Sequence, residues 1–231
     1  MAQYYSPKIA TNGLVLMLDA SSKKSYPGSG DAWYDLSGYN NHATLNGGVF
    51  SNENNGIIDT SGSSSSIIIN DHPSLRFTQE FTLCIWVKFS NIINDSYRAL
   101  FGKPAFYNYG IIVEWYGDNE LLVDFTDSTD EARHGIGGIF PSLTDWNFIS
   151  YSYKMNGGSN NQAVHLWKPT GLESFYATLE SNLEILTSEE IVQISDAGLN
   201  IKIGAAYAYN RALSFSEMQQ NFNSMRTRFK I

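Results

Sequence analysis

The sequence predicts an all-β protein: a two-sheet antiparallel jelly-roll sandwich, closed by a short C-terminal helix. Three observations predict this class. Short stretches of alternating apolar and polar residues recur between segments rich in Gly, Asn and Ser, as in strands joined by turns. Aromatic residues, which favour strands, make up 14% of the 231 residues. Charged residues make up only 16%, below the usual share of about a quarter, so uncharged polar side chains must supply much of the surface.

The strand at 81–89 ("FTLCIWVKF") carries apolar residues on both of its faces. One face holds Phe81 and every second residue up to Phe89, and the other includes Cys84 and Trp86. This pattern predicts a strand in the middle of a sheet, covered on both sides. The other predicted strands span 14–20, 66–70, 98–103, 109–115, 120–126, 146–153, 162–168, 174–180 and 199–209.

The C-terminal segment has the pattern of a helix rather than a strand. Ser214 and Glu217 have the spacing of a capping box, and Leu213 can contact Met218 as a hydrophobic staple. An apolar stripe at helical spacing predicts that this helix lies against the sandwich. The stripe consists of Phe215, Met218, Phe222 and Met225. We therefore predict one domain over 1–231, with a helix at 214–226 and room for an N-terminal arm at 1–12.

Charge and targeting signals narrow the classes of function. The formal net charge is −8, which disfavours binding to nucleic acid phosphates. The basic residues Arg226, Arg228 and Lys230 are expected to complement the C-terminal dipole of the helix. The start of the chain lacks a signal-peptide pattern, and no apolar run is long enough to insert into a membrane. We expect synthesis in a cytoplasm, with action outside a cell only after lysis or as part of a particle.

The stretch "WYDLSGYNNHATLNG" (33–47) concentrates aromatic, Asp, Asn, Gly and His residues. We interpret it as a structural corner in which Trp33 fills the sandwich edge, Asp35 and Ser37 bond backbone amides, and Gly38 adopts a positive φ. His42 then leads into the next strand. A catalytic role is disfavoured because a lone His has no adjacent nucleophile in this stretch. The single cysteine, Cys84, excludes an intrachain disulfide and is expected in the core.

The stretch from "GLVLMLDA" through "WYDLSGYNNHATLNG", together with "FTLCIWVKF", "DWNFISYSY" and "YNRALSFSEMQQNFNSMRTRF", resembles a known family. These motifs are similar to those of the laminin-G-like, concanavalin A-like lectin/glucanase domains of bacteriophage virion structural proteins. The similarity extends nearly end to end. It implies a concanavalin A-like sandwich and a structural or glycan-binding role in a virion.

Because the wider superfamily includes glucanases, we looked for paired carboxylates. Glycoside hydrolysis needs two such groups across the scissile bond. The nearest candidates, Glu120, Asp124 and Asp127, lack the family's spacing. We therefore predict that the protein is not an enzyme.

The resemblance also implies a possible Ca²⁺ site, since laminin-G-like domains often hold this ion. Asp124, Asp127 and Asp130 lie close together in the sequence and offer the oxygen ligands that Ca²⁺ requires. The alternative, which we favour, is a solvated acidic loop.

Glycan sites combine an aromatic platform with a few polar groups. The candidates for such a site are Tyr107, Asn108, Tyr109, Trp115 and Tyr116. The alternative, which we favour, is that these aromatics pack at the sheet edge or against a neighbouring subunit.

The sequence therefore predicts a non-enzymatic phage virion protein, namely a capsid-decoration, tail-fibre or baseplate-associated module. It would bind host surface glycans or other virion proteins, without nucleic acid or membrane insertion, and it could form a homo-oligomer. A free carbohydrate-binding lectin or a degenerate glycoside hydrolase is the alternative.

Overall fold

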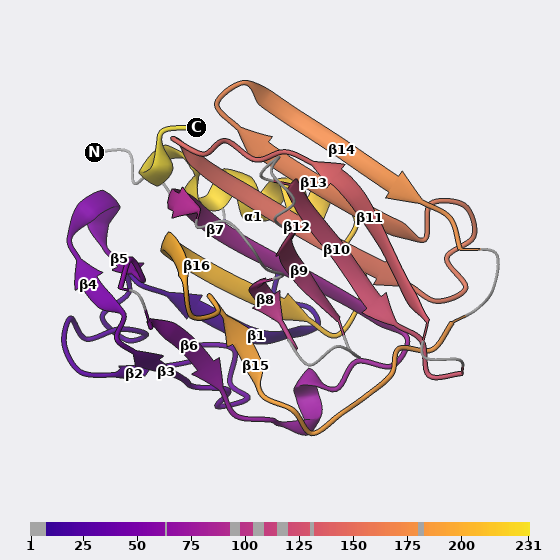
Figure 1. The fold of residues 1–231 in the computed structure, drawn as a ribbon, viewed down its shortest axis with the longest axis horizontal. Helices are drawn as coiled ribbons and strands as arrows, with labels where there is room; N and C mark the ends of the chain where they lie inside the picture. The colour runs from indigo at the N-terminus through magenta and orange to yellow at the C-terminus, as the bar shows by residue number, and fades with distance from the viewer. Residues whose placement is uncertain are drawn as a thin grey trace.

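Two antiparallel sheets face each other, and one helix covers the outer side of one of them (Figure 1). The computed structural model describes residues 8–62, 64–92, 98–103, 109–114, 120–129, 132–179 and 183–231. Sheet A has the order β14-β13-β12-β7-β16-β5-β4, with β1 also paired to β16. Sheet B has the order β11-β10-β9-β8-β15-β6-β3-β2. The predicted two-sheet sandwich with a C-terminal helix is confirmed.

The strands of sheet A are β1 (Leu14–Asp19), β4 (Val49–Ser51), β5 (Ile57–Asp59), β7 (Glu80–Ile92), β12 (Trp146–Lys154), β13 (Gln162–Lys168), β14 (Gly171–Ala177) and β16 (Leu199–Tyr209). Those of sheet B are β2 (Ala32–Trp33), β3 (Ala43–Asn46), β6 (Ser66–Ile69), β8 (Arg98–Gly102), β9 (Tyr109–Glu114), β10 (Glu120–Thr126), β11 (Arg133–Ile139) and β15 (Val192–Ile194). Two 3₁₀ turns, η1 (Glu53–Asn55) and η2 (Pro73–Leu75), and the helix α1 (Phe215–Phe229) complete the described elements.

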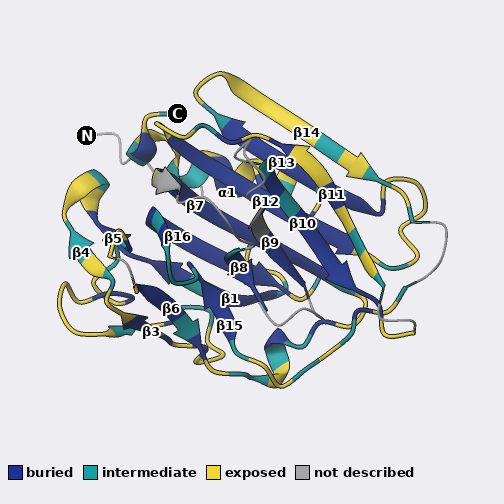
Figure 2. Cartoon of the chain, viewed as in Figure 1, coloured by how far each residue is buried: buried dark blue, intermediate teal, exposed yellow. Residues whose placement is uncertain are grey.

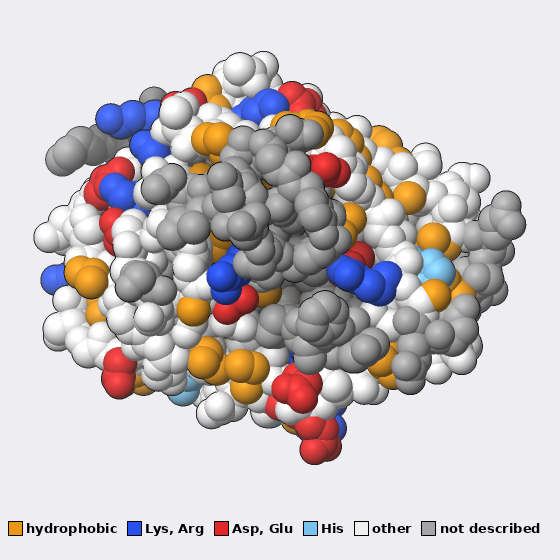
Figure 3. Space-filling model, in the orientation of Figure 1, with side chains coloured by type: hydrophobic (Ala, Val, Ile, Leu, Met, Phe, Trp, Pro, Cys, Tyr) orange, Lys and Arg blue, Asp and Glu red, His pale blue; other side chains and the backbone are white. Residues whose placement is uncertain are grey.

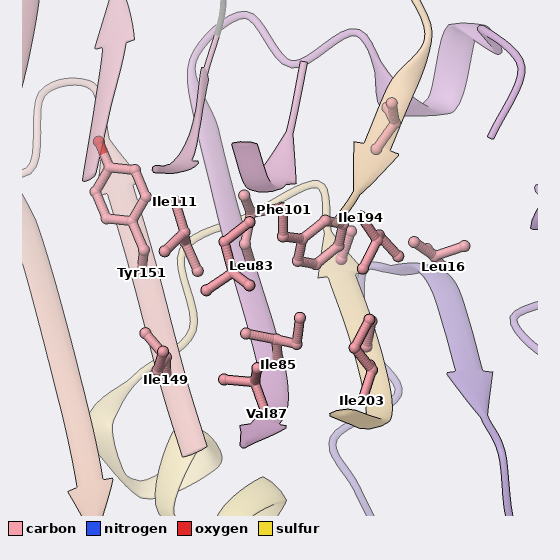
Figure 4. Close-up of a cluster of buried hydrophobic side chains, with 14 of the residues drawn as sticks. Leu16, Leu83, Ile85, Val87, Phe101, Ile111, Ile149, Tyr151, Ile194 and Ile203 are labelled. Atoms are coloured by element: carbon pink, nitrogen blue, oxygen red, sulfur yellow. The ribbon is translucent and has the colours of Figure 1, made fainter. Parts of the chain in front are cut away.

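Strand β7 lies between β12 and β16 and is covered on both faces, as its sequence predicts. One face, with Leu83, Ile85 and Val87, points into the core between the sheets, where it meets side chains such as Phe101 and Ile194 of sheet B (Figure 4). The other face places Cys84 and Trp86 in a second apolar cluster beneath α1. In Figure 2, the residues at the centre of the two sheets are buried, and the exposed residues lie mainly at the ends and edges of the sheets.

Helix α1 begins as predicted and ends three residues later than predicted. The Ser214 side chain accepts from the Glu217 amide, and the Glu217 side chain accepts from the Ser214 amide, so both halves of the capping box form. The helix continues past Arg226 to Phe229, which is 3% exposed and stacks on Trp86. The burial of this ring explains the extra turn. Lys230 then caps the helix in the left-handed conformation.

Residues 8–12, the described part of the predicted arm, lie against α1. The Ala10 amide donates to Asn221 Oδ1, and the Ala10 carbonyl accepts from the Tyr209 hydroxyl. Gln220 donates to the Lys8 carbonyl. The segment is therefore tied to both α1 and β16. No helix among the described residues is long and apolar enough to span a membrane.

The stretch 33–47 forms the predicted structural corner. Asp35 is 8% exposed, and its carboxylate accepts from the backbone amides of Met17, Ser37 and Asn41. Gly38 has a φ of 97°. His42 Nδ1 accepts from the Asp35 amide, so the ring completes the corner just before β3.

The face drawn in Figure 3 carries basic and acidic side chains next to one another in small groups. Among the described residues, oppositely charged side chains form ion pairs, such as Arg133 with Asp124 and Arg98 with Asp196. The described part of this face therefore presents a mixed surface rather than a field of one sign.

Candidate ligand-binding pocket on the outer face of sheet A

A pocket opens on the outer face of sheet A, between β14 and the N-terminal end of α1, with a volume of about 210 Å³. Its floor comes from strand pairing. Ser152 of β12 pairs with Ala163 of β13, which in turn pairs with Tyr176 of β14. Paired residues point to the same face of a sheet, so the small side chains of Ser152 and Ala163 leave a depression beside the Tyr176 ring.

Two exposed aromatic rings border this pocket. Tyr176 is 53% exposed and stands on the edge strand β14. Phe215, the first residue of α1, is 43% exposed, and its ring lies parallel to that of Trp167, with centroids 6.3 Å apart and an interplanar angle of 14°. Large apolar side chains exposed on both sides of one pocket are the arrangement that a flat, partly apolar ligand requires.

His165 lies between the two rings and holds them in place. Its ring meets Tyr176 edge to face at 5.6 Å and lies 5.0 Å from Phe215. Nδ1 shares a hydrogen bond of 2.8 Å with the Ser174 hydroxyl. Burial lowers the pKa of His165 to about 4, so the imidazole is neutral near pH 7.

Near neutral pH, His165 and Ser174 are poorly suited to act as a base and a nucleophile. A general base works best with a pKa near the operating pH, and burial moves this imidazole well away from it. No Asp or Glu is among the twelve residues that line the pocket, so the pocket offers no carboxylate pair for glycoside hydrolysis.

Polar groups occupy the end of the pocket formed by the β12–β13 turn. Asn160 and Asn161 line it together with Lys154 and Gly157. The Asn161 side chain accepts from the Leu179 amide, which fixes the turn against the segment that follows β14. The Lys154 ammonium lies 3.8 Å from the Glu80 carboxylate. Amide and ammonium groups beside an aromatic wall supply the hydrogen bonds that orient a polar ligand.

Two larger cavities in the described part of the chain lack this combination. One, of about 350 Å³, lies around η2 and the start of β7, and its single aromatic residue, Phe77, is buried in the core. The other, of about 300 Å³, lies between residues 8–11 and α1 and contains no aromatic side chain. Of these three cavities lined by described residues, the pocket on β12, β13 and β14 is therefore the best candidate for ligand binding.

Of the glycan-binding residues predicted from sequence, four lie outside the described residues, namely Tyr107, Asn108, Trp115 and Tyr116. Tyr109 is described, and its prediction as a ligand platform is corrected. The ring is 3% exposed, packs against Phe77 and Phe81, and donates its hydroxyl to the Leu75 carbonyl. Burial raises the pKa of this hydroxyl well above its usual value.

The acidic residues expected in a solvated loop are buried where the structure describes them. Asp124 and Asp127 are 6% and 0% exposed rather than solvated. Asp124 accepts from Arg133 Nε at 2.7 Å, and Asp127 Oδ2 lies 2.7 Å from His134 Nε2. Each of these two carboxylates thus has a side-chain partner on β11, and Asp130 lies outside the described residues. Among the residues that the structure describes, no group of three or more His, Cys, Asp or Glu could hold a metal.

Sequence reasoning missed His165, Tyr176 and the polar turn as parts of one site. Their strands were predicted, but the pairing register that brings Ser152, Ala163 and Tyr176 into one row was not. A usable signal was present in the three consecutive strands joined by short turns, the first rich in Gly and Asn and the second formed by Pro169 and Thr170. Such spacing predicts a meander with aligned outer faces. The first residue of the predicted helical stripe, Phe215, then marks where the helix meets that face.

The fold is a two-sheet antiparallel β-sandwich, and solved structures match it. No family model matches the sequence, and no curated protein matches it. One such structure is of botulinum neurotoxin type C, whose cell entry is reported to depend on interaction with two ganglioside molecules. It aligns with a TM-score of 0.68, at 14% identity, over 93% of this chain and 52% of that one.

Two further solved structures share this fold. The binding domain of botulinum neurotoxin DC in complex with rat synaptotagmin II aligns with a TM-score of 0.65, at 14% identity, over 93% of this chain and 52% of that one. The type G receptor-binding domain aligns with a TM-score of 0.59, at 15% identity, over 91% and 51%. This chain spans about half the length of each protein. At this identity the likeness shows the fold alone.

Proposed function

We propose that this protein is a non-enzymatic binding module that holds a saccharide unit in the pocket between Tyr176 and Phe215. The observation that carries the proposal is the pair of exposed rings on either side of a floor made of Ser152 and Ala163. The apolar face of a sugar ring packs on such aromatic surfaces, while its hydroxyls bond to nearby amides. Asn160 and Asn161 supply amides at one end.

The size of the pocket supports a small binding unit. Drug-sized ligands occupy cavities of about 300–1,000 Å³. The volume of about 210 Å³ suits one terminal ring of a longer glycan. Of the botulinum neurotoxin structures with this fold, one is reported with a dependence of cell entry on gangliosides and one is a complex with synaptotagmin II. They support a surface-binding role for this chain.

A glycan array followed by calorimetry tests the proposal. We expect selective binding, and we expect Y176A to weaken it by about 3–10-fold, since an aromatic contact contributes about 0.5–1.5 kcal/mol beyond its area. Tyr39 offers a matched control, because it is 44% exposed and lies in the corner at 33–47. Y39A should bind as the unchanged protein does. An array without selective binding, or equal affinity in Y176A, would refute the assignment.

The finer proposal is that the module works in a bacteriophage particle, as a capsid-decoration, tail-fibre or baseplate-associated protein. The sequence motifs described above support this location, and the mixed, aromatic-bearing surface suits contact with host glycans or virion proteins. Mass spectrometry of purified particles, with antibody labelling in the electron microscope, tests it. Absence of the protein from intact particles would favour the alternative, a free lectin.

A further inference from the structure

The strands at the four ends of the two sheets differ in how well they are protected against pairing with another chain. A fifth edge, β1, pairs with β16 alone, and the Met17 amide and carbonyl on this strand are already bonded to Asp35 and Leu36 of the corner. Unpaired edge groups invite such pairing, and proteins block it with short strands, bulges, prolines or charges. At one end of sheet A, β4 has three residues, and at one end of sheet B, β2 has two. The other edge of sheet B, β11, has an irregular register with β10 and three glycines.

The remaining end strand, β14, is the least protected of the four, with one charged residue, Glu173, among its seven. It pairs with β13 over all seven residues without a bulge, and it contains no proline. Figure 2 shows it exposed along most of its length, and Figure 1 shows it forming one border of the molecule. Its outer side carries Leu172 and Tyr176, which are 40% and 53% exposed. Phe140, 47% exposed, lies nearby, because its carbonyl accepts from Lys168 at the end of β13.

The strand is also complementary to itself. We propose that two copies of this protein pair through their β14 strands, antiparallel and in register about Ser174. Ser174 is the middle residue of the strand, so this register pairs all seven residues. In this register, Leu172 of each copy lies opposite Tyr176 of the other. The dimer therefore covers both exposed side chains of each copy.

Charge favours the same register. The one ionised side chain on β14 is Glu173, and it would face Phe175 of the second copy rather than another carboxylate. A register centred on Glu173 would set two carboxylates opposite each other, which is destabilising. Glu173 already pairs with Lys168 at 2.6 Å, so the edge is locally neutral. The net charge of −8 on each chain opposes association at long range, so added salt should tighten the dimer.

The pairing would also extend the pocket. Tyr176 forms one wall of it, and the second copy would place Leu172 beside that ring. The dimer would therefore present two pockets close to one shared edge, an arrangement that increases avidity for a surface bearing many glycans. The interface stands on the strand geometry and does not depend on whether the pocket binds a saccharide.

Sedimentation velocity over a range of protein concentrations tests the dimer without any ligand. One strand from each copy is a small interface, so we expect a monomer–dimer equilibrium in the micromolar range. L172K places a charge opposite Tyr176 and should weaken the dimer at least tenfold. The control is V49K, which alters a side chain that is 65% exposed on β4, at the opposite edge of the same sheet. V49K should dimerise normally, and thermal unfolding verifies that both variants fold.

Cross-linking tests the register. With a short bis-maleimide, S174C should cross-link to its own copy, whereas L172C should not, since position 172 faces 176 in the second copy. A mixture of L172C and Y176C should cross-link as a heterodimer. The native Cys84 is fully buried and will not compete. A protein that stays monomeric at all concentrations, a dimer that tolerates L172K, or equal cross-linking of S174C and L172C would each overturn the proposal.

Discussion

The ring of Phe229 lies almost parallel to the indole of Trp86, with centroids 4.5 Å apart and an interplanar angle of 22°. Trp86 comes from the central strand of sheet A, and Phe229 is the last residue of α1. Phe229 also lies 4.4 Å from Trp146 of β12. This contact joins the end of the helix to the middle of the sheet and fixes the helix that carries Phe215 into the pocket.

We expect F229A to destabilise the protein by about 3–5 kcal/mol, because it removes a buried aromatic ring and leaves a cavity against Trp86 and Trp146. Urea unfolding followed by tryptophan fluorescence measures the loss. F215A makes the same substitution at the other end of the helix, where the ring is 43% exposed, and should cost much less. Equal losses in the two variants would contradict the anchoring role of Phe229.

The corner at Asp35 provides a second stability test. D35A would remove the acceptor for three backbone amides and one hydroxyl. Each buried donor left without a partner costs about 1–3 kcal/mol, though such costs do not add fully. We expect a loss of at least about 2 kcal/mol in urea unfolding. D31A, at an exposed position in the preceding loop, should leave stability nearly unchanged. A D35A protein as stable as D31A would show that other groups replace the carboxylate.

Much of the fold was predictable because local patterns coincide with tertiary roles. The two apolar faces of 81–89 predicted a strand buried on both sides, and β7 has that position. The Ser214–Glu217 spacing predicted the start of α1. The end of the helix was missed because Phe229 is held by tertiary contacts with Trp86 and Trp146, which no local pattern reveals.

Other elements escaped prediction for physical reasons. Strands β2, β4, β5 and β15 have two or three residues each, too few to show a period. The glycines of β11 hide its strand character, although Gly135 is required because a Cβ there would meet the backbone of Val123 and Asp124. The pocket was missed because it depends on register and on where the helix crosses the sheet. Tyr109 was misassigned because an aromatic residue beside a predicted loop can point inward as readily as outward.

The salt bridge between Glu217 and Arg211 predicts a dependence of stability on acid pH. The hydrogen bond that Glu217 accepts from Arg211 is the main reason why the pKa of Glu217 is lowered to about 2. A carboxylate with a lowered pKa in the folded state contributes stability above its unfolded value, near pH 4.5, and this contribution is lost as the pH falls toward 2.

We therefore expect the melting temperature of the unchanged protein to fall more steeply between pH 4.5 and 2 than that of E217Q. Differential scanning calorimetry across this range measures it. E190Q, at an exposed position, is the control and should keep the slope of the unchanged protein. Parallel slopes in all three proteins would show that folding does not lower the pKa of Glu217.

His165 predicts a second pH dependence, in a separate window and with a direct connection to the pocket. Burial lowers its pKa to about 4, whereas an exposed imidazole titrates near 6.5. Between these two values, the unfolded chain thus binds a proton that the folded chain does not. Stability is therefore lost as the pH falls from 6.5 through 4.

NMR titration of the His165 ring should give a midpoint near 4. H165F keeps an aromatic ring between Tyr176 and Phe215 but cannot bind a proton, so its stability should change less over the same window. A midpoint near 6.5 would mean that the ring is solvated, and the pocket would then lack the buried wall on which its proposed binding role depends.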